Sequence, residues 1–254
     1  MNLSTFEING IDISTFNETV DWSKINCNFV AMRVGYGRTI DNKFSINWAN
    51  SKGKVNRFTY WYMDYYSNWY NKKSSAYGLT DAAWGKEQAD NCWGAIKNDP
   101  EGLVFLDVEN GGSSYSKPLT DPATKEHAEI IARSFLTRMD ELNKKKNGIY
   151  CSIGWISWFY SWFRDRPLWV AWYNKLVDKD DVLYSSFKNG WLGEVLYWQF
   201  SSTEKIAGIV GNVDGNGWIQ SVERYASFME KPIPPVLSDK EKLDRLWQAH
   251  PELH

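Results

Sequence analysis

One short run constrains the fold more than any other part of the chain. Residues 103–109, Leu-Val-Phe-Leu-Asp-Val-Glu, are apolar almost throughout and end in two acids. A near-continuous apolar run of this length is typical of a strand buried on both faces, as parallel strands covered by helices are. Because side chains alternate along a strand, Asp107 and Glu109 should project to the same face, roughly 6.5–7 Å apart along the chain. Burial and like charge would then keep one carboxyl protonated near neutral pH, as a general acid requires.

Strand-like runs alternate with helical patterns elsewhere in the chain, which predicts an α/β fold with βαβ units around a parallel sheet. One helix is predicted after a capping candidate at Asp81, and another begins at Asp121-Pro122 and stops at Asn147-Gly148. The predicted strands are residues 29–34, 58–62, 103–109, 148–152, 168–172 and 195–199.

The chain length of 254 residues suits one large domain followed by a tail. A proline-rich stretch at residues 231–235 cannot continue a helix or a central strand, so residues 1–230 are predicted to form the catalytic barrel. Residues 231–254 are predicted to form a linker and a short amphipathic helix, which either covers an edge of the barrel or engages a partner.

The composition excludes several classes of protein. A hydrophobic share of 43% and a charged share of 24% are typical of a soluble globular protein, and no apolar run approaches the length of a membrane span. The first residues lack the pattern of a secretory signal, which predicts synthesis in the cytoplasm. A formal charge of -2 provides no field that would attract nucleic acid.

The chain also offers few ligands for a metal or cofactor. Its three cysteines, Cys27, Cys92 and Cys151, show no paired spacing, so we expect buried thiols rather than disulfides or a zinc site. The three histidines do not suggest a metal centre either. We therefore expect neither a metal nor a cofactor.

Aromatic residues are unusually frequent, with 15 Trp, 14 Tyr and 12 Phe. A pyranose presents an apolar face that stacks on aromatic rings, so a site rich in Trp and Tyr suits an extended glycan. Roughly two-thirds of these rings should simply fill the core, since large rings dominate packing area. Only the aromatic residues near strand ends are candidates for substrate contact.

Several short motifs follow one another in a distinctive order and together resemble the glycoside hydrolase family 25 lysozymes. The resemblance spans about residues 8–228 and rests on residues 10–14 (GIDIS), 30–33 (VAMR), 105–109 (FLDVE), 149–150 (IY), 168–171 (LWVA), 198–202 (WQFSS) and 213–216 (VDGN). Members of that family, found in phage endolysins, bacteria and fungi, are N-acetylmuramidases. The resemblance implies an irregular TIM-like barrel with fewer outer helices than strands. It also implies cleavage, with retention, of the β-1,4 bond between N-acetylmuramic acid and N-acetylglucosamine in peptidoglycan.

The resemblance also implies roles for individual residues. Glu109 would be the general acid and then the base for water, while Asp107 would orient the 2-acetamido group of the substrate, which acts as the nucleophile. Asp12 and Asp214 would bound the pocket and tune the charge of the acid, at the carboxyl ends of barrel strands. The substrate contacts expected from position near strand ends are Tyr62, Tyr150, Trp172 and Gln199.

The chain departs from the family pattern in two places. Gly215 stands where an apolar residue is usual between Asp214 and the following Asn, and with Gly217 it predicts a looser loop. Residues 63–81 are unusually aromatic and polar for a connection in this family, which leaves their substrate contacts open.

Three alternatives compete with this hydrolase. A non-catalytic glycan-binding or virion structural protein could keep the fold, although all four acids are present. A chitinase-like or glucosaminidase-like barrel would carry a further acid two residues before Asp107, where Phe105 stands. A nucleotide-binding protein needs a third glycine that residues 34–38 lack. The favoured partner is the peptidoglycan glycan strand, attacked by a monomer that acts on the cell wall after release, without inserting into a membrane.

Overall fold

The computed structural model describes residues 2–17, 20–65, 78–110 and 119–229. The chain divides into two compact units, Met1–Ile219 and Gln220–His254. The predicted linker and C-terminal helix at residues 231–254 lie outside the described residues, and so does the middle of the aromatic segment 63–81. None of the helices in the described ranges is both long and apolar enough to cross a lipid bilayer.

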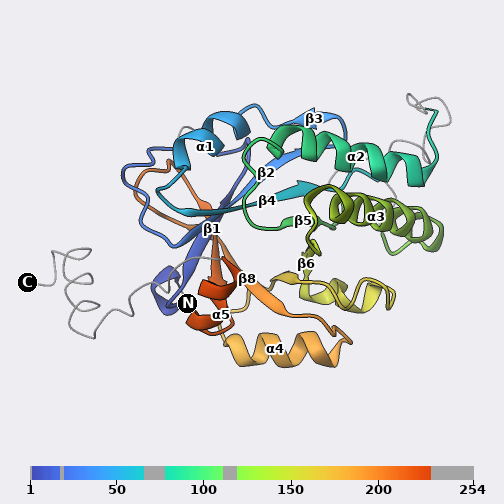
Figure 1. Ribbon diagram of the computed structural model, residues 1–254. Coiled ribbons are helices and arrows are strands. Elements are labelled where there is room, and N and C mark those ends of the chain that lie inside the picture. The colour runs from blue at the N-terminus through green and yellow to red at the C-terminus, as the bar shows by residue number, and fades with distance from the viewer. Residues whose placement is uncertain (1, 18–19, 66–77, 111–118, 230–254) are drawn as a thin grey trace, which may run out of the picture. The chain divides into compact units, whose positions relative to one another are not determined.

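The first unit is a closed barrel (Figure 1). Its sheet runs in the order β1-β9-β8-β7-β6-β5-β4-β2, and pairing of β1 with β2 closes it, while the short strand β3 extends β2. Neighbouring barrel strands run parallel, except that β9 is antiparallel to both β1 and β8. The strands are β1 (Asn9–Ile13), β2 (Phe29–Tyr36), β3 (Thr39–Ile40), β4 (Asn56–Tyr62), β5 (Val104–Asp107), β6 (Gly148–Ser152), β7 (Leu168–Ala171), β8 (Val195–Glu204) and β9 (Val213–Trp218).

Helices cover only part of the barrel. Figure 1 shows α2 and α3 together beside the strands, and the two helices pack on each other. Among the described residues of the first unit, eight barrel strands are accompanied by four α-helices, which confirms the predicted irregular barrel with fewer helices than strands. The helices are α1 (Phe44–Ser51), α2 (Asp81–Ile96), α3 (Pro122–Asn143) and α4 (Lys179–Lys188), with short 3-10 turns η1 (Leu3–Thr5) and η2 (Ile153–Trp158); α5 (Val222–Phe228) belongs to the second unit.

Each of the six predicted strands is present, and the helix boundaries needed small corrections. The cap of α2 is Thr80, whose hydroxyl accepts a hydrogen bond from the Ala83 amide at 3.2 Å, and not Asp81. The cap of α3 is Asp121, as predicted. That helix ends at Asn143, because Lys144 adopts a left-handed conformation with φ of 58°, and not at Asn147-Gly148.

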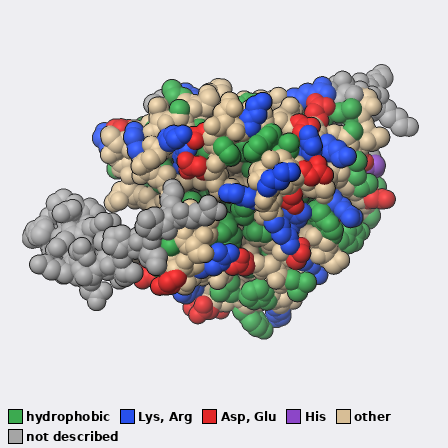
Figure 2. Space-filling view, in the orientation of Figure 1, with side chains coloured by type: hydrophobic (Ala, Val, Ile, Leu, Met, Phe, Trp, Pro, Cys, Tyr) green, Lys and Arg blue, Asp and Glu red, His purple; other side chains and the backbone are tan. Residues whose placement is uncertain are grey.

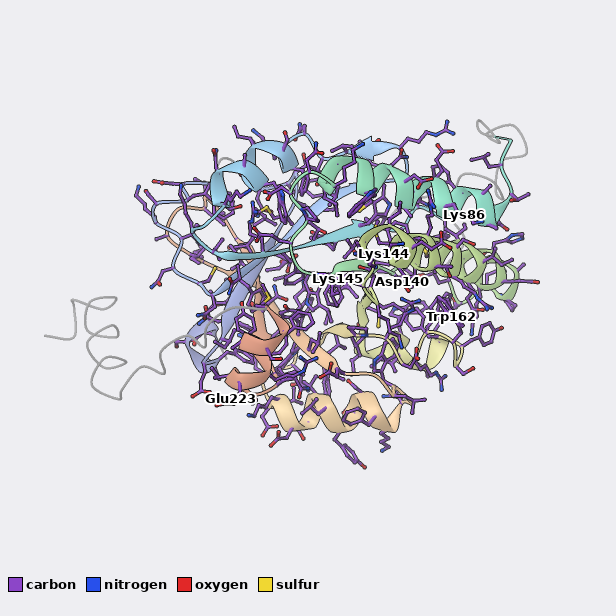
Figure 3. The ribbon with its side chains drawn as sticks, in the orientation of Figure 1. Lys86, Asp140, Lys144, Lys145, Trp162 and Glu223 are labelled. Carbon is purple, nitrogen blue, oxygen red and sulfur yellow. The ribbon has the colours of Figure 1, made fainter. Side chains whose placement is uncertain are left out.

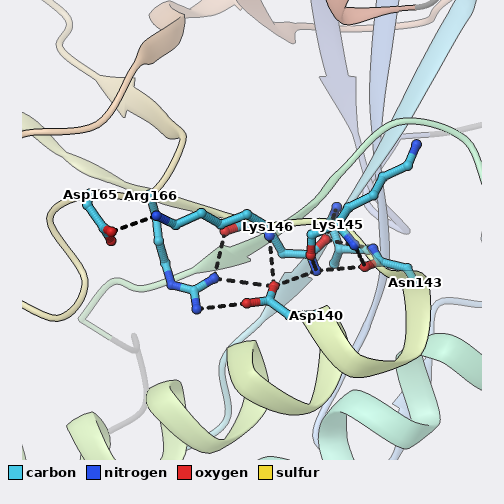
Figure 4. A network of polar contacts seen from close by, with 8 residues as sticks. Asp140, Asn143, Lys145, Lys146, Asp165 and Arg166 are labelled. Atoms are coloured by element: carbon cyan, nitrogen blue, oxygen red, sulfur yellow. Dashed lines mark hydrogen bonds and ion pairs between the residues drawn. The ribbon is translucent and has the colours of Figure 1, made fainter.

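A polar network explains why α3 ends early (Figure 4). The Asn147 Oδ1 atom accepts hydrogen bonds from the Val104 amide at 3.0 Å and from Asn143 Nδ2 at 2.8 Å. Asn147 Nδ2 donates to Asp140 Oδ1 at 2.9 Å, and Arg166 Nη2 donates to Asp140 Oδ2 at 2.9 Å. The network thus ties the end of α3 to the starts of β5 and β6. Figure 3 shows Asp140, Lys144 and Lys145 together at this end of the helix.

Replacing Asn147 with alanine is expected to lower the free energy of unfolding by about 3 kcal/mol, because buried donors and acceptors lose their partners. Denaturant titration followed by circular dichroism measures the loss. Asn189→Ala is the matched control, since that exposed side chain donates to the Ser185 carbonyl of the adjacent helix and should change stability by less than about 0.5 kcal/mol. Equal losses in the two variants would contradict the role given to the network.

The barrel interior is filled by a layer of aromatic rings. Phe58 lies 4.6 Å from Tyr197 between ring centroids, and Phe29 lies 4.9 Å from Tyr197, so rings from non-neighbouring strands meet across the barrel. Glycines make room for this layer: a Cβ at Gly10 would lie 2.3 Å from the Phe29 ring. The layer consists of Phe29, Phe58, Phe105, Trp169, Tyr197 and Trp218. This aromatic layer fills the barrel beneath the polar residues at the carboxyl ends of the strands.

Candidate active site

The first acid pair stands at the end of β5. Asp107, the last residue of the strand, points to the same side as Phe105 two residues earlier and is only 4% exposed. Glu109 lies two residues beyond the strand and is exposed to solvent. The two carboxyls lie close enough for the charge of Glu109 to raise the pKa of Asp107. The pair therefore joins a buried acid to one that solvent can reach.

Burial and like charge raise the pKa of both members of this pair. Desolvation is the largest cause for Asp107, followed by the charges of Glu109 and Asp12. Desolvation also raises the pKa of Glu109, because surrounding protein restricts hydration of its carboxyl although the residue as a whole is exposed. The charge of Asp214 raises the pKa of Glu109 further, whereas the side-chain interaction with Asp107 and the charge of Arg33 lower it. The pair is thus suited to hold one proton near neutral pH.

The second acid pair joins β1 to β9. Asp12 and Asp214 are directly opposite each other in the antiparallel register of these strands, so their side chains share a face. Burial raises the pKa of Asp12 well above its usual range, and the charge of Asp214 adds to the effect. Burial raises the pKa of Asp214 to about 6, and a hydrogen bond from Asp12 opposes the rise. The antiparallel β9 is therefore what brings the fourth predicted acid to the other three.

Two side-chain amides hold the second pair. Gln199 Nε2 donates to Asp12 Oδ2 at 2.8 Å and to Asp214 Oδ2 at 3.4 Å. Asn216 Nδ2 donates to the same Asp12 oxygen at 2.7 Å. The hydroxyls of Tyr150, at 2.7 Å, and of Tyr173 donate to Gln199 Oε1. These contacts connect residues of β1, β6, β8 and β9 into one polar cluster.

Arg33 supplies a positive charge beside the acids. Its guanidinium donates to Asp41 Oδ2 at 2.9 Å and lies 5.2 Å from the Phe16 ring centroid. Its charge lowers the pKa of Asp107 and of Glu109, although its ion pair is with Asp41. Among the described residues, the catalytic candidates are therefore not locked in arginine ion pairs.

The structure gathers most of the predicted site residues but not all. Tyr62 is half-buried at the end of β4, where it is the register partner of Asp107. Trp172 is not brought to the acids, since it packs against the hydrophobic core that includes Leu168 and Val170. The residues brought together are Asp12, Asp107, Glu109, Asp214, Tyr150 and Gln199.

Sequence reasoning missed four residues of the cluster: Arg33, Tyr173, Asn216 and Trp169. A signal for Tyr173 was available, because it follows the inward-facing Trp169 by an even number of residues, whereas Trp172 does not. Asn216 could similarly have been placed with Asp214 by alternation. Nothing local in the sequence indicates that Arg33 faces the acids.

The predicted loose loop at Gly215 and Gly217 was wrong. Both glycines lie within β9 and are buried. A Cβ at Gly217 would lie 2.1 Å from the Phe6 ring, which stacks on Phe200 at 5.0 Å between centroids. The glycines therefore let an N-terminal aromatic ring pack on the strand and do not loosen it.

The cysteines are free thiols among the described residues, with Cys92 and Cys151 buried and Cys27 only partly so, against the expectation that all three are buried. Across the described ranges, no group of three or more His, Cys, Asp or Glu residues could hold a metal ion. On the face drawn in Figure 2, acidic and basic side chains are interspersed.

Comparison with known proteins agrees with this geometry. The sequence pattern of the family described as glycosyl hydrolases family 25 matches residues 11–209, which include Asp12, Asp107 and Glu109. The chain belongs to this family. This member of family 25 is accordingly a glycosidase, and Asp214 lies just beyond the matched range.

Three proteins similar to this family 25 member are each less than 25% identical to it. The YegX protein of Escherichia coli K12 is 23% identical over 239 residues, which cover 89% of this chain and 75% of that protein. The bacterial lysozyme from Streptomyces coelicolor is 20% identical with a TM-score of 0.63, covering 87% of this chain and 96% of that one. The modular autolysin LytC from Streptococcus pneumoniae is 20% identical with a TM-score of 0.65, covering 83% of this chain; this chain spans about half of LytC, 46% of its length. These likenesses show the barrel fold.

Proposed function

We propose that this family 25 glycosidase hydrolyses the β-1,4 bond between N-acetylmuramic acid and N-acetylglucosamine in peptidoglycan. The observation that carries the proposal is the Asp107 and Glu109 pair, two neighbouring carboxyls with raised pKa values beside a third and a fourth acid. The similar structures support the substrate, since they include lysozymes and muramidases, and LytC has been solved with a synthetic peptidoglycan ligand. The roles of the two carboxyls follow from which of them a substrate can reach.

Glu109 is the member of the pair that can reach a glycosidic oxygen, because Asp107 is 4% exposed and Glu109 is open to solvent. In the proposed first step Glu109 gives its proton to the leaving oxygen as the C1–O bond breaks. The carbonyl oxygen of the substrate's 2-acetamido group attacks C1 and forms a positively charged oxazolinium ion. Asp107 accepts a hydrogen bond from the acetamido N–H, and its negative charge stabilises that cation.

In the second step Glu109, now ionised, takes a proton from water, and the water oxygen bonds to C1 while the C1–O bond of the oxazolinium ring breaks. Two inversions at C1 give net retention. Asp12 and Asp214 bound the site and raise the pKa of the neighbouring acids through their charge. Tyr62 and Tyr150 are proposed to contact the glycan, whereas Trp172, which packs against the core, is not. Gln199, which is 2% exposed, is proposed to act mainly by holding Asp12 and Asp214.

One barrel carries both acid pairs, so the proposal does not need a second copy of the chain, and we propose that the protein works as a monomer. Its substrate lies outside the cytoplasmic membrane. We therefore propose that the protein acts on the cell wall after release.

The identity of the reducing sugar that digestion releases tests the proposed specificity. Purified peptidoglycan is digested, reduced with borohydride and analysed by mass spectrometry. Reduced N-acetylmuramic acid is expected, and proton NMR during digestion should show the β-anomer first. Reduced N-acetylglucosamine would identify a glucosaminidase, and released amino groups would identify an amidase; either result would overturn the proposal.

Asp214→Asn is expected to move the alkaline limb of the kcat/KM profile to lower pH. Glu109 must be protonated to act, so activity falls as pH rises through its pKa, and the charge of Asp214 raises that pKa. Removing the charge lowers the pKa and moves the limb. Asp165→Asn is the control, because it also removes one carboxylate charge, from an exposed acid paired with Lys146, and should leave the limb in place. An unmoved limb in Asp214→Asn would contradict this electrostatic coupling.

A further inference from the structure

A chain of hydrogen bonds begins beneath the acids, in the aromatic layer of the barrel interior. The Trp169 indole Nε1 donates to Asn216 Oδ1 at 2.8 Å, and Asn216 Nδ2 donates to Asp12 Oδ2 at 2.7 Å. Trp169 is 1% exposed and Asn216 is fully buried, so neither side chain can touch a glycan. Any effect of these two residues on the reaction must therefore pass through the groups they contact. Among these, Asp12 is the acid whose carboxyl Asn216 bonds, while the Trp169 ring also packs on Tyr150 at 4.6 Å between centroids.

The indole determines which way the Asn216 amide points. An indole N–H can only donate, so the oxygen of the amide must face Trp169 and its NH₂ group must face Asp12. The tyrosine hydroxyls around Gln199 do not fix the orientation of its amide in this way, because a hydroxyl can either donate or accept a hydrogen bond. Trp169 is thus the group that fixes the direction of donation toward Asp12.

We propose that Trp169 and Asn216 are positioning residues of the hydrolase: the indole fixes the Asn216 amide, and the amide holds the Asp12 carboxyl in the rotation that joins it to Asp214. The proposal rests on the proposed function of the site. Asp12 Oδ2 receives donors from both Asn216 and Gln199, which restricts rotation of the carboxyl. The interaction of the Asp12 carboxyl with that of Asp214, its register partner, depends on that rotation.

The pKa of Asp12 depends on the hydrogen bonds that its carboxyl accepts and on the groups around it. Burial is the largest cause of its raised pKa, and the hydrogen bonds from Gln199 and Asn216 lower that pKa by stabilising the charged form. The titratable groups that face it are two acids and three tyrosines from the other elements around it: Asp214, Asp107, Tyr60, Tyr150 and Tyr173. Losing one amide donor therefore shifts ionisation of the Asp12 and Asp214 pair to higher pH.

Trp169→Phe tests the relay, because it removes the N–H and keeps a ring in the aromatic layer. The Asn216 amide is then free to turn its oxygen toward Asp12. We expect kcat/KM on peptidoglycan to fall about tenfold, mostly in kcat, as catalytic groups lose alignment. Because Asp12 stays neutral to higher pH in the variant, its charge raises the pKa of Asp107 less. The acid limb of the pH profile, which reports ionisation of Asp107, should therefore move to lower pH. A residue that serves only stability would not move that limb.

Trp191→Phe is the matched control. Trp191 is 1% exposed and its indole donates to the Arg166 carbonyl at 2.9 Å, so this change also removes one buried indole hydrogen bond. Its thermal midpoint should fall by an amount similar to that of Trp169→Phe, with kcat/KM and the pH profile unchanged. Asn216→Leu should reproduce the acid-limb shift, and adding Trp169→Phe to it should shift the limb no further.

The outcomes separate the two proposals. A wild-type protein without hydrolytic activity on peptidoglycan would overturn the proposed function, whereas an active wild type with a Trp169→Phe variant of unchanged profile would overturn the relay alone. Should the variants fail to fold, NMR of the wild type decides. Side-chain amide resonances of Asn216 that move as Asp12 titrates support the relay, and resonances that stay fixed contradict it.

Discussion

Replacing Glu109 with glutamine is expected to lower kcat/KM on purified peptidoglycan about 10²- to 10⁴-fold, the usual contribution of a general acid and base. Glutamine keeps the size of the side chain, so the fold should be unchanged. It has no acidic proton to give to the leaving oxygen and cannot take one from water. Release of new reducing ends under conditions where substrate is limiting measures the effect.

Glu126→Gln is the control for this substitution. Glu126 is an exposed residue of α3, and no change of activity is expected there. Both variants should show the circular dichroism spectrum and thermal midpoint of the wild type. A folded Glu109→Gln variant that releases reducing ends at the wild-type rate would remove Glu109 from its assigned role.

Replacing Phe58 with alanine is expected to cause the largest loss of stability, about 3–5 kcal/mol in the free energy of unfolding. Phe58 is 1% exposed, and its ring meets those of Tyr197, Phe105 and Trp169 from three other strands, at 4.6, 5.3 and 5.6 Å between centroids. Removing it leaves a cavity at the centre of the barrel, where rigid strands on all sides prevent collapse.

Denaturant unfolding of Phe58→Ala should be compared with that of Phe187→Ala. Phe187 lies on α4 and is 51% exposed, so its loss should cost less than about 1 kcal/mol. Equal losses of stability in the two variants would contradict the claim that the aromatic layer stabilises the barrel beneath the site.

The parts of the fold that follow from local pattern could be predicted. The run from Leu103 onward predicted β5, but the strand ends at Asp107, so Glu109 lies two residues beyond it and not on the predicted strand. The acid cap and proline at Asp121-Pro122 predicted the start of α3. The end of α3 could not be predicted in the same way, because Asn147 bonds a backbone amide of another strand, at Val104.

The polar cluster was harder to predict, because it depends on closure of the barrel. Asn216 donates to Asp12 across 204 positions of sequence, and the contact exists only because β9 runs antiparallel between β1 and β8. If β9 ran parallel to β1 and β8, its residues would pair with those of β1 in a different register. No pattern within residues 213–218 indicates strand direction, so the partners of Asp12 had to come from the structure.

The central claim is that Asp107 and Glu109 together retain one proton near neutral pH. Carbon-13 NMR of labelled carboxyls, titrated from acid to alkaline pH, tests this most directly, with Glu109→Gln and Asp107→Asn used to assign the signals. The expected result is a two-step titration in which one step lies well above the usual range of an exposed carboxyl and the two signals respond to each other. Independent titration of both carboxyls at their ordinary pKa values, leaving no proton near neutral pH, would contradict it.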